Sequence, residues 1–112
     1  MRLLIALLSS LVAVYAVDNR LLYTIPAGDT IDAFRSQFEK TCSTWRPAKR
    51  AGLKFRGVLF EPGDYSGKHT DMEARIVCSW YNTSTPNAPS VTYTRAVAEH
   101  LGATKTSDVA SH

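Results

Sequence analysis

The sequence predicts an α+β domain in which one amphipathic helix packs across a small antiparallel sheet of about four strands. Three observations support this. The segment DTIDAFRSQFEKTC carries apolar residues at helical spacing, several other segments alternate as strands do, and the two cysteines fall on apolar faces of the helix and of one strand. A chain of 112 residues also suits one small domain.

The beginning of the chain has the pattern of a secretory signal peptide. Arg2 precedes an apolar run from Leu3 to Val14, and small residues follow, so residues 1–16 are expected to be removed on secretion. The run is shorter than the roughly 20 residues that span a bilayer, and we expect no stable membrane insertion. Residues 17–102 then form the domain, and the small, polar residues 103–112 are expected to be a flexible tail.

The predicted helix follows Asp29 or Thr30, either of which can cap it, and Asp32 lies in its first turn, where a negative charge is favourable. Its apolar stripe consists of Ile31, Phe34, Phe38 and Cys42. The helix should end at Arg46, because the residue before a proline disfavours helical geometry.

Four segments are predicted as strands: residues 20–25, 53–61, 72–81 and 91–97. In the second, Leu53 and Phe55 alternate inward until Gly57 breaks the pattern, which a β-bulge would restore for Val58 and Phe60. The last strand is expected to run into a short helical turn at residues 98–101.

In a secreted protein, Cys42 and Cys78 are expected to form a disulfide bond. By strand parity, Cys78 shares one face with Ala74, Ile76 and Trp80. Both cysteines would then point into the helix–sheet interface, and their bond would be worth about 4 kcal/mol in the chain-entropy model. Two cysteines without a neighbouring histidine do not form a zinc site, and the sequence predicts no metal and no cofactor.

The segment WRPAKRAGLKFR is basic and contains no acidic residue, although the formal charge of the whole chain is only +3. Candidate residues for binding an anionic partner are Trp45, Arg46, Lys49, Arg50, Lys54 and Arg56. The partner could be RNA, with Trp45 stacked on a base, or a phospholipid headgroup or an acidic glycan. The alternative, which we favour, is a solvated loop with Trp45 packed into the core. Lys49–Arg50 is also a dibasic pair of the kind that processing proteases recognise.

Four residues are candidates for a catalytic set: His69, Glu73, Arg75 and His100. Such groups could cleave RNA if one accepted the 2′-hydroxyl proton, another protonated the leaving oxygen and arginine stabilised the phosphate charge. No local motif fixes their geometry, and the alternative is that they are ordinary surface residues. We favour that alternative and a protein that is not an enzyme.

Asn82-Thr83-Ser84 fits the acceptor pattern for N-glycosylation. By strand parity, Asn82 would share the buried face of Trp80. A glycan at this position therefore requires the strand to end or turn away by Tyr81.

A signal peptide, a short mature chain and one cysteine pair resemble the small secreted effector proteins of plant-associated fungi. Two families are similar: the disulfide-stapled β-sandwich effectors of blast fungi and the ribonuclease-like effectors of powdery mildews. The stretch YTIPAGDTIDAF resembles the opening of the second family, which usually has a cysteine two residues after the aromatic, where this chain has Ile25.

These features lead to a secreted, non-enzymatic effector-type virulence protein that binds a host or extracellular protein, or RNA or another anionic ligand. The alternative is a secreted ribonuclease-like protein, active or vestigial. An inhibitor or antimicrobial protein is a third interpretation, for which two cysteines are few. The sequence does not fix the oligomeric state.

Overall fold

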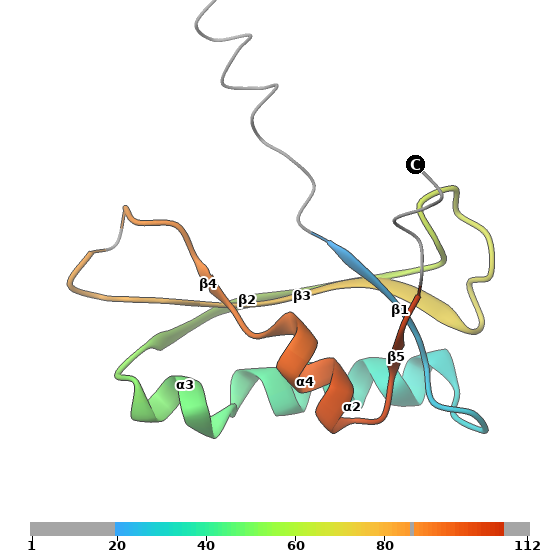
Figure 1. The fold of residues 1–112 in the computed structure, drawn as a ribbon, viewed down its shortest axis with the longest axis horizontal. Coiled ribbons are helices and arrows are strands. Elements are labelled where there is room, and N and C mark those ends of the chain that lie inside the picture. The colour runs from blue at the N-terminus through green and yellow to red at the C-terminus, as the bar shows by residue number, and fades with distance from the viewer. Residues whose placement is uncertain (1–19, 86, 107–112) are drawn as a thin grey trace, which may run out of the picture.

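The computed structural model describes residues 20–85 and 87–106 (Figure 1). The expected signal peptide, residues 1–16, lies outside the described residues. The elements, in chain order, are β1 (Leu21–Thr24), α2 (Ile31–Ser43), α3 (Arg46–Arg50), β2 (Lys54–Pro62), β3 (Glu73–Tyr81), β4 (Val91–Thr92), α4 (Thr94–His100) and β5 (Thr104–Lys105).

The strands form one antiparallel sheet of five strands, and the helices pack against it, so the predicted α+β class is confirmed. The order is β2-β3-β1-β5. The short strand β4 pairs with Ser79 and Trp80 of β3, beyond the point where β1 begins at Leu21. β3 is therefore the central strand, and Figure 1 shows α2 and α3 running alongside it. No helix in residues 20–85 and 87–106 has the length and apolar character needed to cross a membrane.

Helix α2 forms as its sequence predicts. The Thr30 hydroxyl caps it by accepting a hydrogen bond from the Ala33 amide at 3.1 Å. Its stripe buries Phe34, Phe38 and Cys42 against the sheet. The rings of Phe34 and Phe38 lie 5.9 Å and 6.2 Å, centroid to centroid, from the ring of Phe60 on β2. These aromatic contacts hold α2 against β2.

The disulfide bond between Cys42 and Cys78 is present, which confirms the predicted pairing. The two Cα atoms lie 5.8 Å apart, and both side chains are fully buried. Ala74, Ile76 and Trp80 are buried on the same face of β3, again as predicted. The bond thus ties the C-terminal end of α2 to the central strand through the core.

The irregularity predicted near Gly57 is a β-bulge one residue earlier. Phe55 pairs with Trp80 and Gly57 pairs with Ser79, which leaves Arg56 as the extra residue. Phe60 is buried as predicted. Phe55 was expected inside, but it remains 39% exposed and contacts Trp80 edge-on.

The predicted strand over residues 91–97 is wrong beyond its second residue, because α4 begins at Thr94. At this point the Thr94 hydroxyl accepts a hydrogen bond from the Cys78 amide at 2.9 Å. A side-chain oxygen of Thr94 is thus the acceptor for Cys78, in place of a backbone carbonyl oxygen of a continued β4. The buried residues Thr94, Val97 and Ala98 follow helical spacing and pack in the core. The helix therefore covers more than the turn expected at residues 98–101.

Two short elements differ from the sequence-based expectation. Thr104 and Lys105, expected in the tail, form β5 by pairing with Thr24 and Tyr23 of β1. Residues 107–112 lie outside the described residues. The basic segment, expected to be a loop, contains the short helix α3, in whose first turn Pro47 is well tolerated because it needs no hydrogen-bonded amide there.

Candidate anion-binding groove

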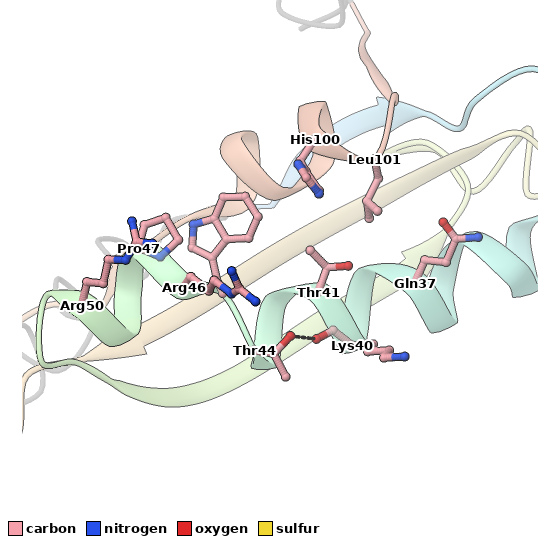
Figure 2. Close-up of a pocket in the computed structure, with 10 residues that line it drawn as sticks. Gln37, Lys40, Thr41, Thr44, Arg46, Pro47, Arg50, His100 and Leu101 are labelled. Carbon is pink, nitrogen blue, oxygen red and sulfur yellow. Dashed lines mark hydrogen bonds between the residues drawn. The ribbon is translucent and has the colours of Figure 1, made fainter.

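A groove of about 640 Å³ lies where the C-terminal half of α2, the short helix α3 and the end of α4 meet (Figure 2). We refer to it as the basic groove. It is lined by Gln37, Lys40, Thr41, Thr44, Trp45, Arg46, Pro47, Arg50, His100 and Leu101.

The break between α2 and α3 creates one side of the groove. Thr44 ends α2, and its hydroxyl donates a hydrogen bond to the Lys40 carbonyl oxygen at 2.8 Å. The chain turns at Trp45, and α3 begins at once. Arg46 and Arg50 are four residues apart on α3 and therefore lie on one face of it, about 5–6 Å apart at their Cβ atoms. Figure 2 shows both residues on α3, with His100 and Leu101 on the other side of the groove.

His100 and Trp45 connect α4 to this turn. His100 lies in the last turn of α4, where the helix dipole favours a positive charge. Its ring centroid is 5.5 Å from that of Trp45, in an edge-on arrangement. Trp45 packs partly against the core, as the favoured interpretation predicted, but it also lines the groove. Its indole N–H is buried and has no hydrogen-bond partner among the described residues.

The groove is positively charged. No aspartate or glutamate is among the described residues that line it. Within the described part of the chain, no ion pair involves Lys40, Arg46 or Arg50. The glutamate next to Lys40, Glu39, instead lies 3.6 Å from the Arg35 side-chain nitrogen on the outer surface of α2. The cations of the groove are therefore available to a negatively charged ligand.

The six residues predicted to bind an anionic partner do not form one site. Trp45, Arg46 and Arg50 line the basic groove, whereas Lys49 and Lys54 line a separate hollow of about 360 Å³ beside Trp80. The guanidinium of Arg56, the bulged residue, lies over the Tyr81 ring at 4.8 Å.

The sequence did not indicate two of the basic side chains that line the groove, Lys40 and His100, or its polar and apolar contributors such as Thr41 and Leu101. Lys40 is only a few residues before Trp45 on the polar side of α2, a spacing that could have suggested it. Nothing local to His100 places it here, because α4 reaches the groove only through tertiary packing.

The four catalytic candidates are divided between the two sides of the sheet. His100 lies in the basic groove on the helical side. Glu73 and Arg75 have the opposite strand parity to the core residue Ala74, which places them on the other face of β3. His69 is exposed in the loop between β2 and β3, with a left-handed φ of 59°. The fold therefore does not bring the four together in one cleft.

Arg75 makes structural contacts with the end of β2 and the start of the loop that follows it. Its guanidinium donates hydrogen bonds to the carbonyl oxygens of Pro62 and Gly63, at 3.2 Å and 3.1 Å, and lies 3.9 Å from a Glu61 carboxylate oxygen. Glu61 also pairs with Arg20. Arg75 thus holds the start of the β2–β3 loop against β3.

The clear pKa shifts in the described chain lie away from the groove. Asp64, in the β2–β3 loop, has its pKa lowered to about 2 by hydrogen bonds from the Ser66 hydroxyl and from the Lys68 amide. Burial raises the pKa of the Tyr23 hydroxyl, and nearby Arg95 partly opposes this shift without reaching good hydrogen-bond geometry. No group of three or more histidine, cysteine, aspartate or glutamate side chains within the described residues could hold a metal ion.

Comparison with protein-family models, with curated proteins and with solved structures found no significant match to this chain.

Proposed function

We propose that the protein is a secreted, non-enzymatic binding protein that recognises an anionic group of its partner through the basic groove. The observation that carries this proposal is the set of Lys40, Arg46 and Arg50 around a groove that has no acidic residue among the described residues lining it. A cavity with charges of one sign concentrates ligands of the opposite sign and accelerates their association.

The side chains of the groove suit a phosphate, sulfate or carboxylate group. A guanidinium can donate two parallel hydrogen bonds to such a group, and Arg46 and Arg50 present two guanidiniums from one helix face. The hydroxyl of Thr41 could add a neutral hydrogen bond, whereas the hydroxyl of Thr44 already donates its proton to the Lys40 carbonyl oxygen. Trp45 and Leu101 supply apolar surface beside these polar groups, so the ligand should combine a negative charge with an apolar or aromatic part.

The resemblance to secreted fungal effectors supports a host or extracellular protein as the partner. The signal-peptide pattern supports secretion, and the disulfide bond is of the kind that oxidising compartments permit. RNA is the alternative partner, because its phosphates and bases have the same two kinds of surface.

An active ribonuclease would need its acid, base and phosphate-binding groups within reach of one phosphate. His100 lies on the helical side of the sheet, whereas Glu73 and Arg75 lie on the other face. This separation is why we prefer binding without catalysis. If RNA is the partner, we expect it to be bound and not cleaved.

Binding of the oxidised, mature protein to heparin and to single-stranded RNA tests the proposal. The variant Arg46→Gln/Arg50→Gln should bind the preferred probe at least about tenfold more weakly, with a shallower dependence of affinity on salt concentration. The control Lys68→Gln/Lys105→Gln removes the same charge at exposed positions outside the groove and should bind nearly as the parent does. Equal losses in both variants, or no binding of either probe by the parent, would refute the groove as the site.

The RNA from the same experiment should remain intact after incubation. Degradation that disappears in His100→Ala would contradict the non-enzymatic assignment and favour the ribonuclease-like alternative. A variant of the opposite sheet face, Glu73→Gln, serves as the matched control for a contaminating nuclease.

A further inference from the structure

The acceptor asparagine Asn82 lies at the end of the central strand. Strand parity alone would direct it toward the core beside Trp80, but β3 ends at Tyr81 and Asn82 is exposed. The exposed residues 83–85 and 87–89 follow it. The conflict that the sequence raised between glycosylation and burial is therefore resolved by the end of the strand.

The turn after β3 presents the side chain of Asn82 in a defined way. Its Oδ1 accepts a hydrogen bond from the Ser84 amide at 2.8 Å, and its carbonyl oxygen accepts one from the Thr85 amide at 3.1 Å. Ser84 is also the hydroxyl-bearing third residue of the acceptor pattern. The side-chain amide nitrogen of Asn82, Nδ2, makes no hydrogen bond with the described residues and is therefore free to react.

Two exposed apolar side chains lie close to this turn. Phe55 on β2 and Val91 on β4 both pair with Trp80 on β3, so the three form one row across the sheet, two residues before Asn82. Phe55 and Val91 are each 39% exposed. Trp80 itself is buried, so the exposed apolar surface consists of the two side chains that flank it, and such surface favours self-association unless something covers it.

We propose that Asn82 carries an N-linked glycan and that this glycan covers Phe55 and Val91. In the transfer, the Asn82 amide nitrogen would bond to the anomeric carbon of a lipid pyrophosphate-linked oligosaccharide. The nitrogen would lose one proton and the lipid pyrophosphate would leave. The proposal requires entry into the secretory pathway but does not depend on a ligand for the basic groove. Among the described residues of β3, β4 and the loop between them, none lines the groove, so the glycan would leave it open.

Expression of the full chain in a eukaryotic secretory host tests the modification. The secreted protein should lose the mass of one glycan on treatment with peptide N-glycosidase, and peptide mapping should show Asn82 converted to aspartate. Asn82→Gln and Ser84→Ala should both abolish the modification. Thr83→Ala keeps the acceptor pattern and should remain modified. An unmodified Asn82, whether the chain is secreted or not, overturns the proposal.

The covering role is tested by comparing the glycosylated and deglycosylated forms at high concentration. Removal of the glycan should increase self-association, and Val91→Thr should reduce that increase by making the exposed row more polar. Thr92→Val, at an exposed position on the same strand but outside the row, serves as the matched control and should not reduce it. Equal self-association of both forms would overturn the covering role. Heparin and RNA binding should not change on deglycosylation, which separates this result from the fate of the groove proposal.

Discussion

The indole N–H of Trp80 donates a hydrogen bond to the carbonyl oxygen of Cys42 at 3.1 Å. The bond joins the central strand to the end of α2, directly beside the disulfide bond between Cys42 and Cys78. The last turn of α2 carries Lys40, and the chain then passes to Trp45. A covalent and a polar contact therefore hold one wall of the basic groove in place.

Removal of the disulfide should greatly destabilise the protein. The bond closes a loop of 36 residues, for which the chain-entropy model predicts about 4 kcal/mol of stabilisation. The variant Cys42→Ala/Cys78→Ala should lower the free energy of unfolding, measured in urea, by about that amount. Alanine suits both positions because the two cysteines are fully buried. A variant that unfolds at the same urea concentration as the parent would show that the bond is not a structural element.

Trp80→Phe should destabilise the fold by about 2 kcal/mol, because it removes a buried hydrogen bond and leaves a small cavity. The lost bond is the one to the Cys42 carbonyl oxygen. Urea unfolding measures the change. Phe55→Leu, at the exposed neighbour in the same row, should cost less than half as much. Equal costs for the two variants would mean that Trp80 contributes only packing.

Arg75→Met should reduce stability by about 2 kcal/mol, because two carbonyl oxygens lose a charged donor. The Glu73 side chain, two residues away on the same face of β3, makes no ion pair with the described residues, so Glu73→Gln should change stability by less than about 0.5 kcal/mol. Thermal unfolding of both variants distinguishes them. Stability that is unchanged in Arg75→Met, with altered RNA binding, would point instead to a functional Arg75.

Acidification should protonate Asp64 unusually late. Its pKa is about 2 in the folded protein against an ordinary value of 3.8, because the Ser66 hydroxyl and the Lys68 amide donate to the carboxylate. The folded-state pKa is the lower one, so the stabilising contribution is complete above the ordinary value and is lost as the pH falls through about 2. The carboxyl carbon of Asp64 should titrate with this midpoint in an NMR experiment.

Ser66→Ala provides the control for that titration, since it removes the largest cause of the shift. The midpoint for Asp64 should then move toward its ordinary value. An Asp64 that titrates normally in the parent protein would show that the Asp64–Lys68 turn is not formed in solution.

The sequence predicted the elements whose patterns are long and regular. The stripe of α2 spans three turns, and burial follows its period. In β3 burial follows the alternation except at Val77, which is buried although it has the opposite parity to Ile76 and Cys78. The same two patterns identified the disulfide bond, because each cysteine falls on a buried position. These are the elements whose local sequence and tertiary environment agree.

The rest depends on tertiary packing. The β-branched segment around Val91–Val97 favours a strand, but the pairing of Thr94 with the Cys78 amide ends β4 and lets α4 begin. β5 has only two residues and no local signal. The basic groove was only partly predictable, because it also depends on tertiary packing. Arg46 and Arg50 belong to one basic segment of the sequence, whereas His100 lies at the end of α4 and lines the groove only in the folded chain.

The pairing of β5 with β1 brings the beginning and the end of the described chain close together. Tyr23 lies opposite Lys105, and the Thr106 amide donates to the Leu22 carbonyl oxygen at 3.1 Å, so the first and last strands run side by side. A short linker could join residues 20 and 106, and new ends could be opened in the exposed loop at residues 87–89. Such a circular permutant would keep every strand pair and the disulfide, with the two ends of its chain moved from β1 and β5 to the loop between β3 and β4.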